Sequence, residues 1–149
     1  MGKTLVILGT NRDDSNTLKA MKDHLPFAKY ELIELHKLKL QHYIYDRDKK
    51  PIDDFLLVAT KMTEVENIVF ATPVYWYAMS GVMKIFFDRL SDLISTSKPL
   101  GRALAGKSVY LFSTGCDLEM PDGFEVPFKR TSEYFKMKYV KSIYVSVKD

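Results

Sequence analysis

The sequence predicts an α/β domain in which a doubly wound parallel sheet of five strands carries helices on both faces. Its 149 residues match the size of one ordinary domain, and no repeat or linker divides residues 1–149. Short apolar runs typical of strands alternate along the chain with segments of helical periodicity. Three of these runs are apolar without interruption, which is typical of strands buried on both faces of a parallel sheet.

The first part of the chain supplies two predicted strands and two predicted helices. Leu5–Leu8 is a continuous apolar run that ends at Gly9 and is expected to be a buried strand. The helix that follows ends at Pro26, and its apolar positions are Leu18, Met21 and Leu25. Tyr30–Leu35 has the alternation of an edge strand, and residues 36–51 are expected to form a long loop. The apolar face of the next helix is formed by Phe55, Val58, Met62 and Val65.

The second part of the chain completes the alternation with three strands and two helices. We expect strands at Ile68–Ala71, Val109–Phe112 and Val140–Val147, and helices over Ser80–Leu90 and near Glu125–Met137. Strands separated by helices form parallel βαβ units, so five strands and four helices predict a flavodoxin-like sheet of order 2-1-3-4-5. Right-handed connections then place the first helix on one face and the other three on the opposite face.

Composition excludes several classes of protein. The formal net charge of +3 is too small to argue for a nucleic acid or a membrane as a partner. The single cysteine, Cys116, leaves no internal disulfide and no multi-cysteine metal site, and we expect no metal. The longest apolar run, Val74–Met79, is far shorter than a membrane span, and the start of the chain does not match a signal peptide, so we expect a cytoplasmic protein.

A basic stretch near the end of the chain could suggest a nucleic-acid site. It consists of Lys129, Arg130, Lys136, Lys138 and Lys141. A solvated helix face followed by an edge strand protected by lysines explains these residues more simply, because no nucleic-acid-binding motif accompanies them. We therefore expect no nucleic acid among the partners.

Ligands of such a sheet bind beyond the carboxyl ends of its strands, and three loops meet there. The loop after the first strand ends where a helix begins near Ser15, and free N–H groups at a helix start favour an anion. Its phosphate-compatible side chains are Thr10, Arg12, Ser15, Asn16 and Thr17. Neither a P-loop nor a G-x-G-x-x-G turn is present, which favours a mononucleotide over tightly held NAD.

The loop after the third strand holds three consecutive aromatic residues, Tyr75, Trp76 and Tyr77. Such rings can flank a flat heterocycle, although a core or interface cluster explains them equally well. The loop after the fourth strand, residues 113–117, offers hydroxyl and backbone donors for the polar edge of that heterocycle. No side chain stands out as an acid, a base or a nucleophile, so we name no catalytic residue.

Two motifs in these loops resemble those of the NAD(P)H-dependent FMN reductase family. The first loop is similar to the family's phosphate loop in its residues Gly9-Thr10-Asn11-Arg12-x-x-Ser15-Asn16-Thr17. The second resemblance is the longer and more specific one, Pro73-Val74-Tyr75-Trp76-Tyr77-x-Met79-Ser80-Gly81-x-Met83-Lys84-x-Phe86-x-Asp88-Arg89. The resemblance covers nearly the whole chain and implies non-covalently bound FMN with NAD(P)H as co-substrate.

The resemblance also implies which residues bind FMN. Thr10, Arg12, Ser15, Asn16 and Thr17 would hold the phosphate; Pro73, Val74, Tyr75 and Trp76 would border the isoalloxazine; Thr114 and Gly115 would approach its pyrimidine end. Two features depart from the family. Residues 36–51 lack the cysteine cluster of iron–sulfur relatives, and the chain stops two residues after Val147, where a fifth helix usually follows. We therefore expect a partner subunit or an unusual loop to cover one face of the sheet, and a homo-oligomer, a dimer or higher.

The expected function is an FMN-dependent oxidoreductase. NAD(P)H would deliver hydride to flavin N5, and a quinone, free flavin or another small acceptor would take the electrons. An electron-carrier flavodoxin is one alternative, although such carriers are usually acidic; a flavin-free binding module is another. A receiver domain would need acidic residues where Gly9-Thr10 and Thr72-Pro73 stand, and a low-molecular-weight phosphatase would need a cysteine at the start of its phosphate loop.

Overall fold

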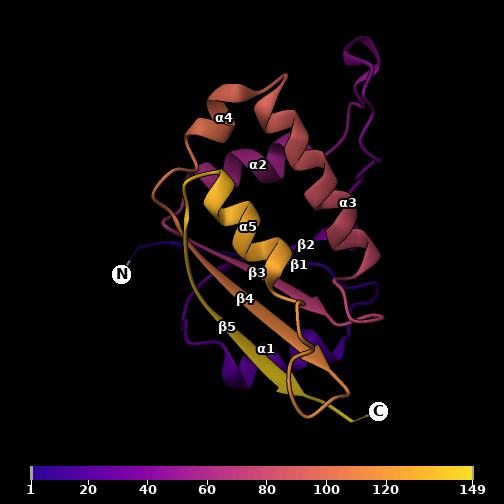
Figure 1. The fold of residues 1–149 in the computed structure, drawn as a ribbon, viewed down its shortest axis with the longest axis vertical. Helices are drawn as coiled ribbons and strands as arrows, with labels where there is room; N and C mark the ends of the chain where they lie inside the picture. Colours follow the sequence, from indigo (N-terminus) through magenta and orange to yellow (C-terminus); the bar gives the residue numbers. More distant parts are fainter. Residues whose placement is uncertain (1, 149) are drawn as a thin grey trace.

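The computed structural model describes residues 2–148, and within them the five predicted strands form one parallel sheet. The strands are β1 (Thr4–Leu8), β2 (Glu31–Glu34), β3 (Asn67–Pro73), β4 (Ser108–Gly115) and β5 (Lys138–Ser146). Their order across the sheet is β2-β1-β3-β4-β5, and every neighbouring pair is parallel (Figure 1). The predicted flavodoxin-like fold class and strand order are therefore confirmed.

The helices include the four predicted ones and some that the sequence did not indicate. The α-helices are α1 (Asn16–His24), α2 (Phe55–Thr63), α3 (Gly81–Arg89), α4 (Lys98–Arg102) and α5 (Val126–Tyr134). Three 3-10 turns accompany them, η1 (Leu35–Lys37), η2 (Arg47–Lys49) and η3 (Leu90–Ile94). The additional elements η3 and α4 are single-turn pieces, too short to show a helical period in the sequence.

The end of α5 differs from the expected boundary near Met137. Lys136 adopts a left-handed conformation with φ 59°, which stops the helix. The backbone N–H of Met137 then donates to the carbonyl oxygen of Ser132 at 2.8 Å. As a result β5 begins at Lys138, two residues earlier than the expected strand start at Val140.

The sheet separates two apolar cores of unequal size. Alternate strand residues face opposite sides, so Leu5 and Ile7 join the larger core beneath α2, α3 and α5, whereas Val6 and Leu8 join the smaller core beneath α1. Figure 1 shows α1 on one side of the sheet and the other labelled helices on the opposite side. This arrangement is the one that right-handed connections require.

The α1 side of the sheet is incompletely covered near β4 and β5. Tyr110, Ile143 and Val145 pack at the margin of the smaller core and remain half-buried. Phe27, from the segment after α1, packs edge-on against Tyr110 with ring centroids 5.0 Å apart. One aromatic side chain thus shields part of a face that a parallel sheet ordinarily buries.

A buried ion-pair network anchors the long loop between β2 and α2. The guanidinium of Arg89 donates to Asp53 Oδ2 at 2.6 Å, to Asp92 Oδ2 at 2.9 Å and to the carbonyl oxygen of Gln41 at 3.0 Å. The side chains of Arg89, Asp53 and Asp92 are 3%, 1% and 6% exposed. Beyond this anchor the loop projects past α3, as Figure 1 shows. No helix within residues 2–148 has the length and apolar character needed to cross a membrane.

Candidate functional site

A cleft of about 490 Å³ lies where the loops after β1, β3 and β4 meet. Its volume falls within the range of small-molecule and cofactor sites. The lining residues are Asn11, Arg12, Ser15, Asn16, Thr17, Pro73, Val74, Tyr75, Thr114, Gly115, Cys116 and Val147. The structure therefore brings together nine of the eleven residues predicted for the cofactor site, all except Thr10 and Trp76.

The first wall of the cleft is the loop that leads into α1. The Ser15 side chain caps the helix, because its Oγ accepts a hydrogen bond from the backbone N–H of Leu18 at 3.1 Å. The Arg12 side chain is 63% exposed and its Nε lies 3.8 Å from an Asp14 carboxylate oxygen, so this guanidinium is free to turn toward an anion. Hydroxyl, amide and guanidinium groups therefore gather at the positive end of the helix dipole.

Thr10 shapes this loop from inside and does not line the cleft. It is 1% exposed, and its Oγ1 donates to the carbonyl oxygen of Arg12 at 3.2 Å. The hydroxyl that was expected to reach a phosphate is thus engaged in the turn that presents Arg12.

The floor of the cleft is held by close contacts between α1, β3 and β4. The Oγ1 atoms of Thr17 and Thr114 are 2.7 Å apart in a buried hydrogen bond. The backbone N–H of Val74 donates to the carbonyl oxygen of Thr114 at 2.7 Å. At Gly115 a Cβ atom would lie 2.7 Å from the Tyr144 hydroxyl oxygen, closer than real Cβ contacts come. Glycine at this position therefore keeps the cleft open beside the loop that follows β4.

Ser80 joins the first and second loops. Its Oγ donates to the carbonyl oxygen of Gly9 at 2.6 Å and accepts from the N–H of Met83 at 3.2 Å. Its backbone N–H donates to Thr72 Oγ1 at 3.0 Å. The sequence predicted a helix that begins at Ser80 but contained no sign of the bond to Gly9, because that contact spans 71 residues.

The aromatic residues after β3 form a tight turn at the mouth of the cleft. Tyr75 and Ala78 exchange two backbone hydrogen bonds, at 2.9 and 3.1 Å, and the central residues Trp76 and Tyr77 have φ values of 50° and 67°. Positive φ at both central residues defines a type I′ turn, which normally holds asparagine and glycine. Trp76 is 93% exposed and lies outside the cleft lining, unlike Tyr75. The turn directs the Trp76 side chain into solvent, although Trp76 was predicted to border the ligand together with Tyr75.

Asn11, Cys116 and Val147 line the cleft but were missing from the residues predicted for the site. Asn11 stands between two predicted residues and could have been included on its position alone. Cys116 follows Gly115 directly, yet a lone thiol gives no signal of its own. Val147 reaches the cleft because its N–H donates to the carbonyl oxygen of Gly115 at 2.8 Å, a contact that only the sheet creates.

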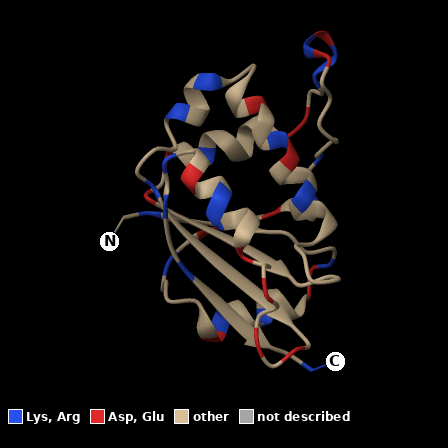
Figure 2. Ribbon diagram, viewed as in Figure 1, with Lys and Arg blue, Asp and Glu red and all other residues tan. Residues whose placement is uncertain are grey.

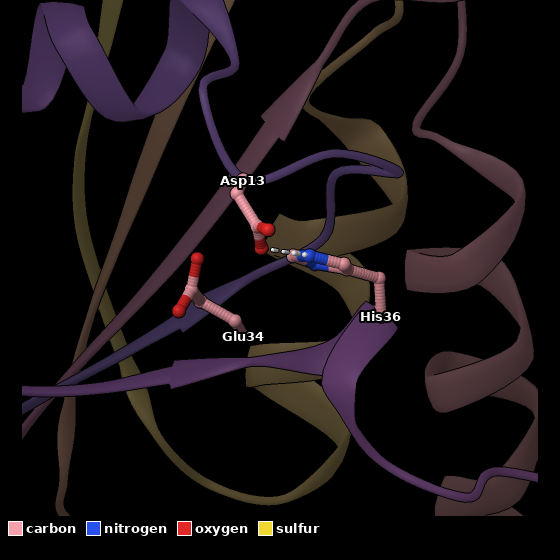
Figure 3. Close-up of side chains that lie close together, drawn as sticks. All are labelled: Asp13, Glu34 and His36. Carbon is pink, nitrogen blue, oxygen red and sulfur yellow. Dashed lines mark hydrogen bonds and ion pairs between the residues drawn. The ribbon is translucent and has the colours of Figure 1, made fainter.

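Behind the first loop, Asp13 meets Glu34 and His36 (Figure 3). Their candidate ligand atoms lie within 4.8 Å of one another, which is close enough to suggest a metal. However, His36 Nε2 is 2.9 Å from Asp13 Oδ1, and the Lys37 ammonium lies 3.5 Å from the same oxygen and 2.7 Å from Glu34. The hydrogen bond from His36 and the charge of Lys37 lower the pKa of Asp13. The cluster therefore serves to tie the first loop to β2 and η1.

The chemistry of the cleft fits a mononucleotide with a planar ring system. Its lining has a helix N-terminus, hydroxyls and a guanidinium at one wall and uncharged residues, several of them apolar, at the others, and it includes no carboxylate. A carboxylate would repel phosphate, so this donor set suits the phosphate and polar edge of FMN. Fold and site together define a mononucleotide-binding protein of the flavodoxin-like class.

Comparison with known proteins identifies the family within that class. The sequence profile described as NADPH-dependent FMN reductase matches residues 3–148. The chain belongs to this family and is an FMN-dependent enzyme that uses NAD(P)H.

Individual relatives agree with this assignment. Over 126 residues the chain is 27% identical to YwqN of Bacillus subtilis (strain 168), named as an NAD(P)H-dependent FMN-containing oxidoreductase; the match covers 77% of this chain and 67% of YwqN. The Trp repressor binding protein of Bacillus subtilis has the same fold, with a TM-score of 0.72 and 24% identity over 98% of this chain and 87% of that protein. General stress protein 14 of Treponema denticola, solved in complex with FMN, superposes with a TM-score of 0.65 and 18% identity over 95% of this chain and 84% of that one.

Proposed function

We propose that this enzyme oxidises NAD(P)H and passes the electrons, through FMN, to a small planar acceptor such as a quinone or free flavin. The observation that carries the proposal is the cleft itself, which combines a helix N-terminus with neutral, partly apolar walls and opens beside exposed aromatic rings. We name no side chain as an acid or base, because the lining presents none that is poised for proton transfer.

In this proposal the first loop holds the phosphate of FMN. The N–H groups at the start of α1 and the Arg12 guanidinium supply positive potential, while Ser15, Asn16 and Thr17 supply donors. The second and third loops border the isoalloxazine, with Pro73, Val74 and Tyr75 on one side and Thr114 with Gly115 on the other. These walls would hold the ring in one orientation, which is the protein's contribution to flavin chemistry.

Bound FMN would supply the two-electron redox chemistry that links oxidation of NAD(P)H to reduction of the acceptor. The protein must leave one side of the site open to both reactants in turn. Tyr75 is 47% exposed at the edge of the cleft, so the lining itself offers a surface to an incoming ring. We assign recognition of the acceptor to this edge and to the adjoining Trp76–Tyr77 turn.

The conformation of the turn supports that assignment. Non-glycine residues at positive φ are strained, and such strain clusters at ligand-binding positions. Trp76 and Tyr77 are 93% and 67% exposed, and aromatic faces stack on planar molecules with about 0.5–1.5 kcal/mol beyond their burial. A planar acceptor is the ligand that this chemistry fits.

The phosphate assignment is tested with the double substitution Arg12→Ala and Ser15→Ala. We expect the dissociation constant for FMN to rise at least about tenfold, because two phosphate donors, one of them charged, are lost. Equilibrium dialysis of the apoprotein with FMN measures this. Lys22→Ala removes the same charge from an exposed position on α1 and should leave FMN affinity unchanged. An unaltered affinity in the double variant contradicts the assignment.

The acceptor is tested by steady-state assays with NADH and NADPH. We expect the FMN-loaded enzyme to oxidise one of them and to reduce a benzoquinone or free flavin at a rate proportional to enzyme. An FMN-loaded protein that leaves both nucleotides unoxidised would be an electron carrier, contrary to the proposal.

The proposal also covers the domain organisation, the oligomeric state and the location of the enzyme. We propose that residues 1–149 act as one FMN-binding domain, since all five strands share one sheet. We further propose a homo-oligomer, a dimer or higher, whose partner covers the half-exposed β4–β5 face, and a cytoplasmic location where NAD(P)H is supplied. The proposal includes no nucleic-acid partner, and the lysines of β5 are assigned to protection of the sheet edge.

A further inference from the structure

A second concave surface lies at the end of the sheet opposite the FMN cleft. Two adjoining cavities, of about 340 and 370 Å³, separate α5 from the chain that runs from the end of α3 through α4. Both are lined by Ile94, Tyr134 and Phe135, so they form one groove. The backbone N–H of Gly106, just before β4, donates to the carbonyl oxygen of Lys136, just before β5, at 2.9 Å. This bond places the groove at the amino ends of the strands, away from the cleft.

The floor and one side of the groove are apolar. Leu93 is 2% exposed and Phe135 is half-buried, whereas Ile94 and Tyr134 are 46% and 65% exposed. Exposed side chains of this size that flank a concavity are typical of a binding surface. An apolar or aromatic group of a ligand would contact these side chains from both α5 and the segment before α4.

The rim is cationic and lacks compensating charge. Lys98, Arg102 and Lys136 line the first cavity, and no aspartate or glutamate does. None of these three forms an ion pair with another residue in the described range 2–148. Figure 2 shows the two basic positions of α4 above α5, without an acidic residue on α4. Three uncompensated cations around one cavity attract an anion.

The backbone at Lys136 adds an independent observation. This residue occupies the left-handed position that ends α5, where its N–H donates to the carbonyl oxygen of Glu133 at 3.0 Å. Glycine is the usual residue there, because a side chain strains the conformation. The chain instead carries a lysine that lines the groove, and strained positions of this kind occur where a ligand is held.

From these features we infer that the groove binds a small amphiphilic anion, namely an aromatic or aliphatic group that bears a carboxylate, sulfonate or phosphate. The apolar floor takes the carbon skeleton and the rim formed by Lys98, Arg102 and Lys136 takes the charge. A nucleic acid would use the cations but leave the apolar floor unfilled, so a compact amphiphile fits better. This site is separate from the FMN cleft and does not depend on the proposed reaction.

The inference is tested on the FMN-loaded protein with 1-naphthalenesulfonate as the probe, followed by proton–nitrogen NMR. We expect saturable shifts in the amides of Ile94, Arg102 and Phe135, while those of the cleft loops stay in place. Uncharged 1-naphthalenemethanol, at the same concentrations, should bind more weakly because it gains nothing from the cationic rim.

Charge-removing variants complete the test. The double variant Lys98→Gln with Arg102→Gln should bind 1-naphthalenesulfonate about fivefold more weakly, which is the size of effect expected for exposed charge pairs. Lys19→Gln with Lys22→Gln removes the same charge from α1 and should have no effect. Three results would overturn the inference: no saturable shift at the groove, equal affinity for the uncharged probe, or equal affinity in the α4 variant. The spectrum of each variant shows directly that it remains folded.

Discussion

Gly115 is a lining residue of the cleft that has no room for a side chain. A Cβ atom there would stand 2.7 Å from the hydroxyl oxygen of Tyr144 and 3.3 Å from the Cβ of Val74. Moving the Tyr144 hydroxyl away would break the hydrogen bond that it donates to the carbonyl oxygen of Asp117 at 2.7 Å. A single methyl group would therefore push apart two of the three loops that form the cleft.

Gly115→Ala should lower the free energy of unfolding by about 1–3 kcal/mol, the usual result of overpacking, and should weaken FMN binding. Urea unfolding and FMN titration measure the two effects. Gly81→Ala is the matched control, since nothing lies within 4 Å of its added methyl group. The double change Gly115→Ala with Tyr144→Phe removes the clashing hydroxyl oxygen and should restore part of the FMN affinity; no restoration would show that the contact with Tyr144 is not the cause.

At the scale of elements, the Arg89 network joins α3 and η3 to the long loop before α2. Burial alone would raise the pKa of Asp53, but hydrogen bonds from Arg89 and from the backbone N–H groups of Gln41 and Phe55 outweigh it and hold the pKa below its ordinary value. The ionised carboxylate is thus the form that the fold stabilises. Removing Asp53 leaves the buried Arg89 guanidinium with Asp92 as its one remaining carboxylate partner within residues 2–148.

Asp53→Asn should destabilise the protein by about 3 kcal/mol, the lower end of the usual cost of breaking a buried ion pair, because Arg89 stays charged and buried but keeps Asp92. Asp88→Asn, which removes an exposed pair with Lys84, should cost less than about 1 kcal/mol. The pH dependence follows from the lowered pKa. The Asp53 contribution is complete above the unfolded value of about 3.9 and disappears as the pH falls through the lower folded value, so the variant should lose less stability than wild type across that acidic range. If the free energies of unfolding of wild type and variant fell in parallel across this acidic range, the prediction would be wrong.

The strained turn after β3 gives a second prediction at this scale. Trp76→Asn with Tyr77→Gly installs the residues that a type I′ turn prefers, and we expect the protein to gain about 1–2 kcal/mol of stability. The same change removes the two exposed rings, so the KM for a planar acceptor should rise while FMN affinity is retained. Thermal unfolding and acceptor titrations check the two parts. A variant that is more stable with an unchanged KM would mean that the turn does not recognise the acceptor.

At the scale of the whole molecule, the two faces of the sheet are unequally covered. The helices α2, α3 and α5 pack over the larger core, whereas α1 is the one helix within residues 2–148 that covers the other face, where Ile143 and Val145 remain half-buried. A parallel sheet ordinarily buries both faces, so a second subunit is the simplest cover.

Sedimentation velocity at a series of concentrations should show a dimer or higher oligomer that dissociates on dilution. Ile143→Lys introduces a charge into the proposed contact and should shift the equilibrium toward monomer. Val126→Lys introduces the same charge at a half-exposed position on α5, on the opposite face, and should not. Wild-type protein that remains monomeric at all concentrations would contradict the proposed interface.

Local sequence patterns were enough to predict the fold class, the strand order and most of the residues that line the cleft. Buried parallel strands are apolar over their whole length, and the loops that follow them must meet at one edge, so local patterns such as Leu5–Leu8 and Ser15–Thr17 sufficed. Contacts between distant segments became visible in the folded molecule alone: the Ser80–Gly9 bond, the position of Val147 in the cleft and the Arg89 network. The tertiary structure also placed Trp76 outside the cleft and Thr10 beneath it, because backbone conformation, not residue type, sets where a loop side chain points.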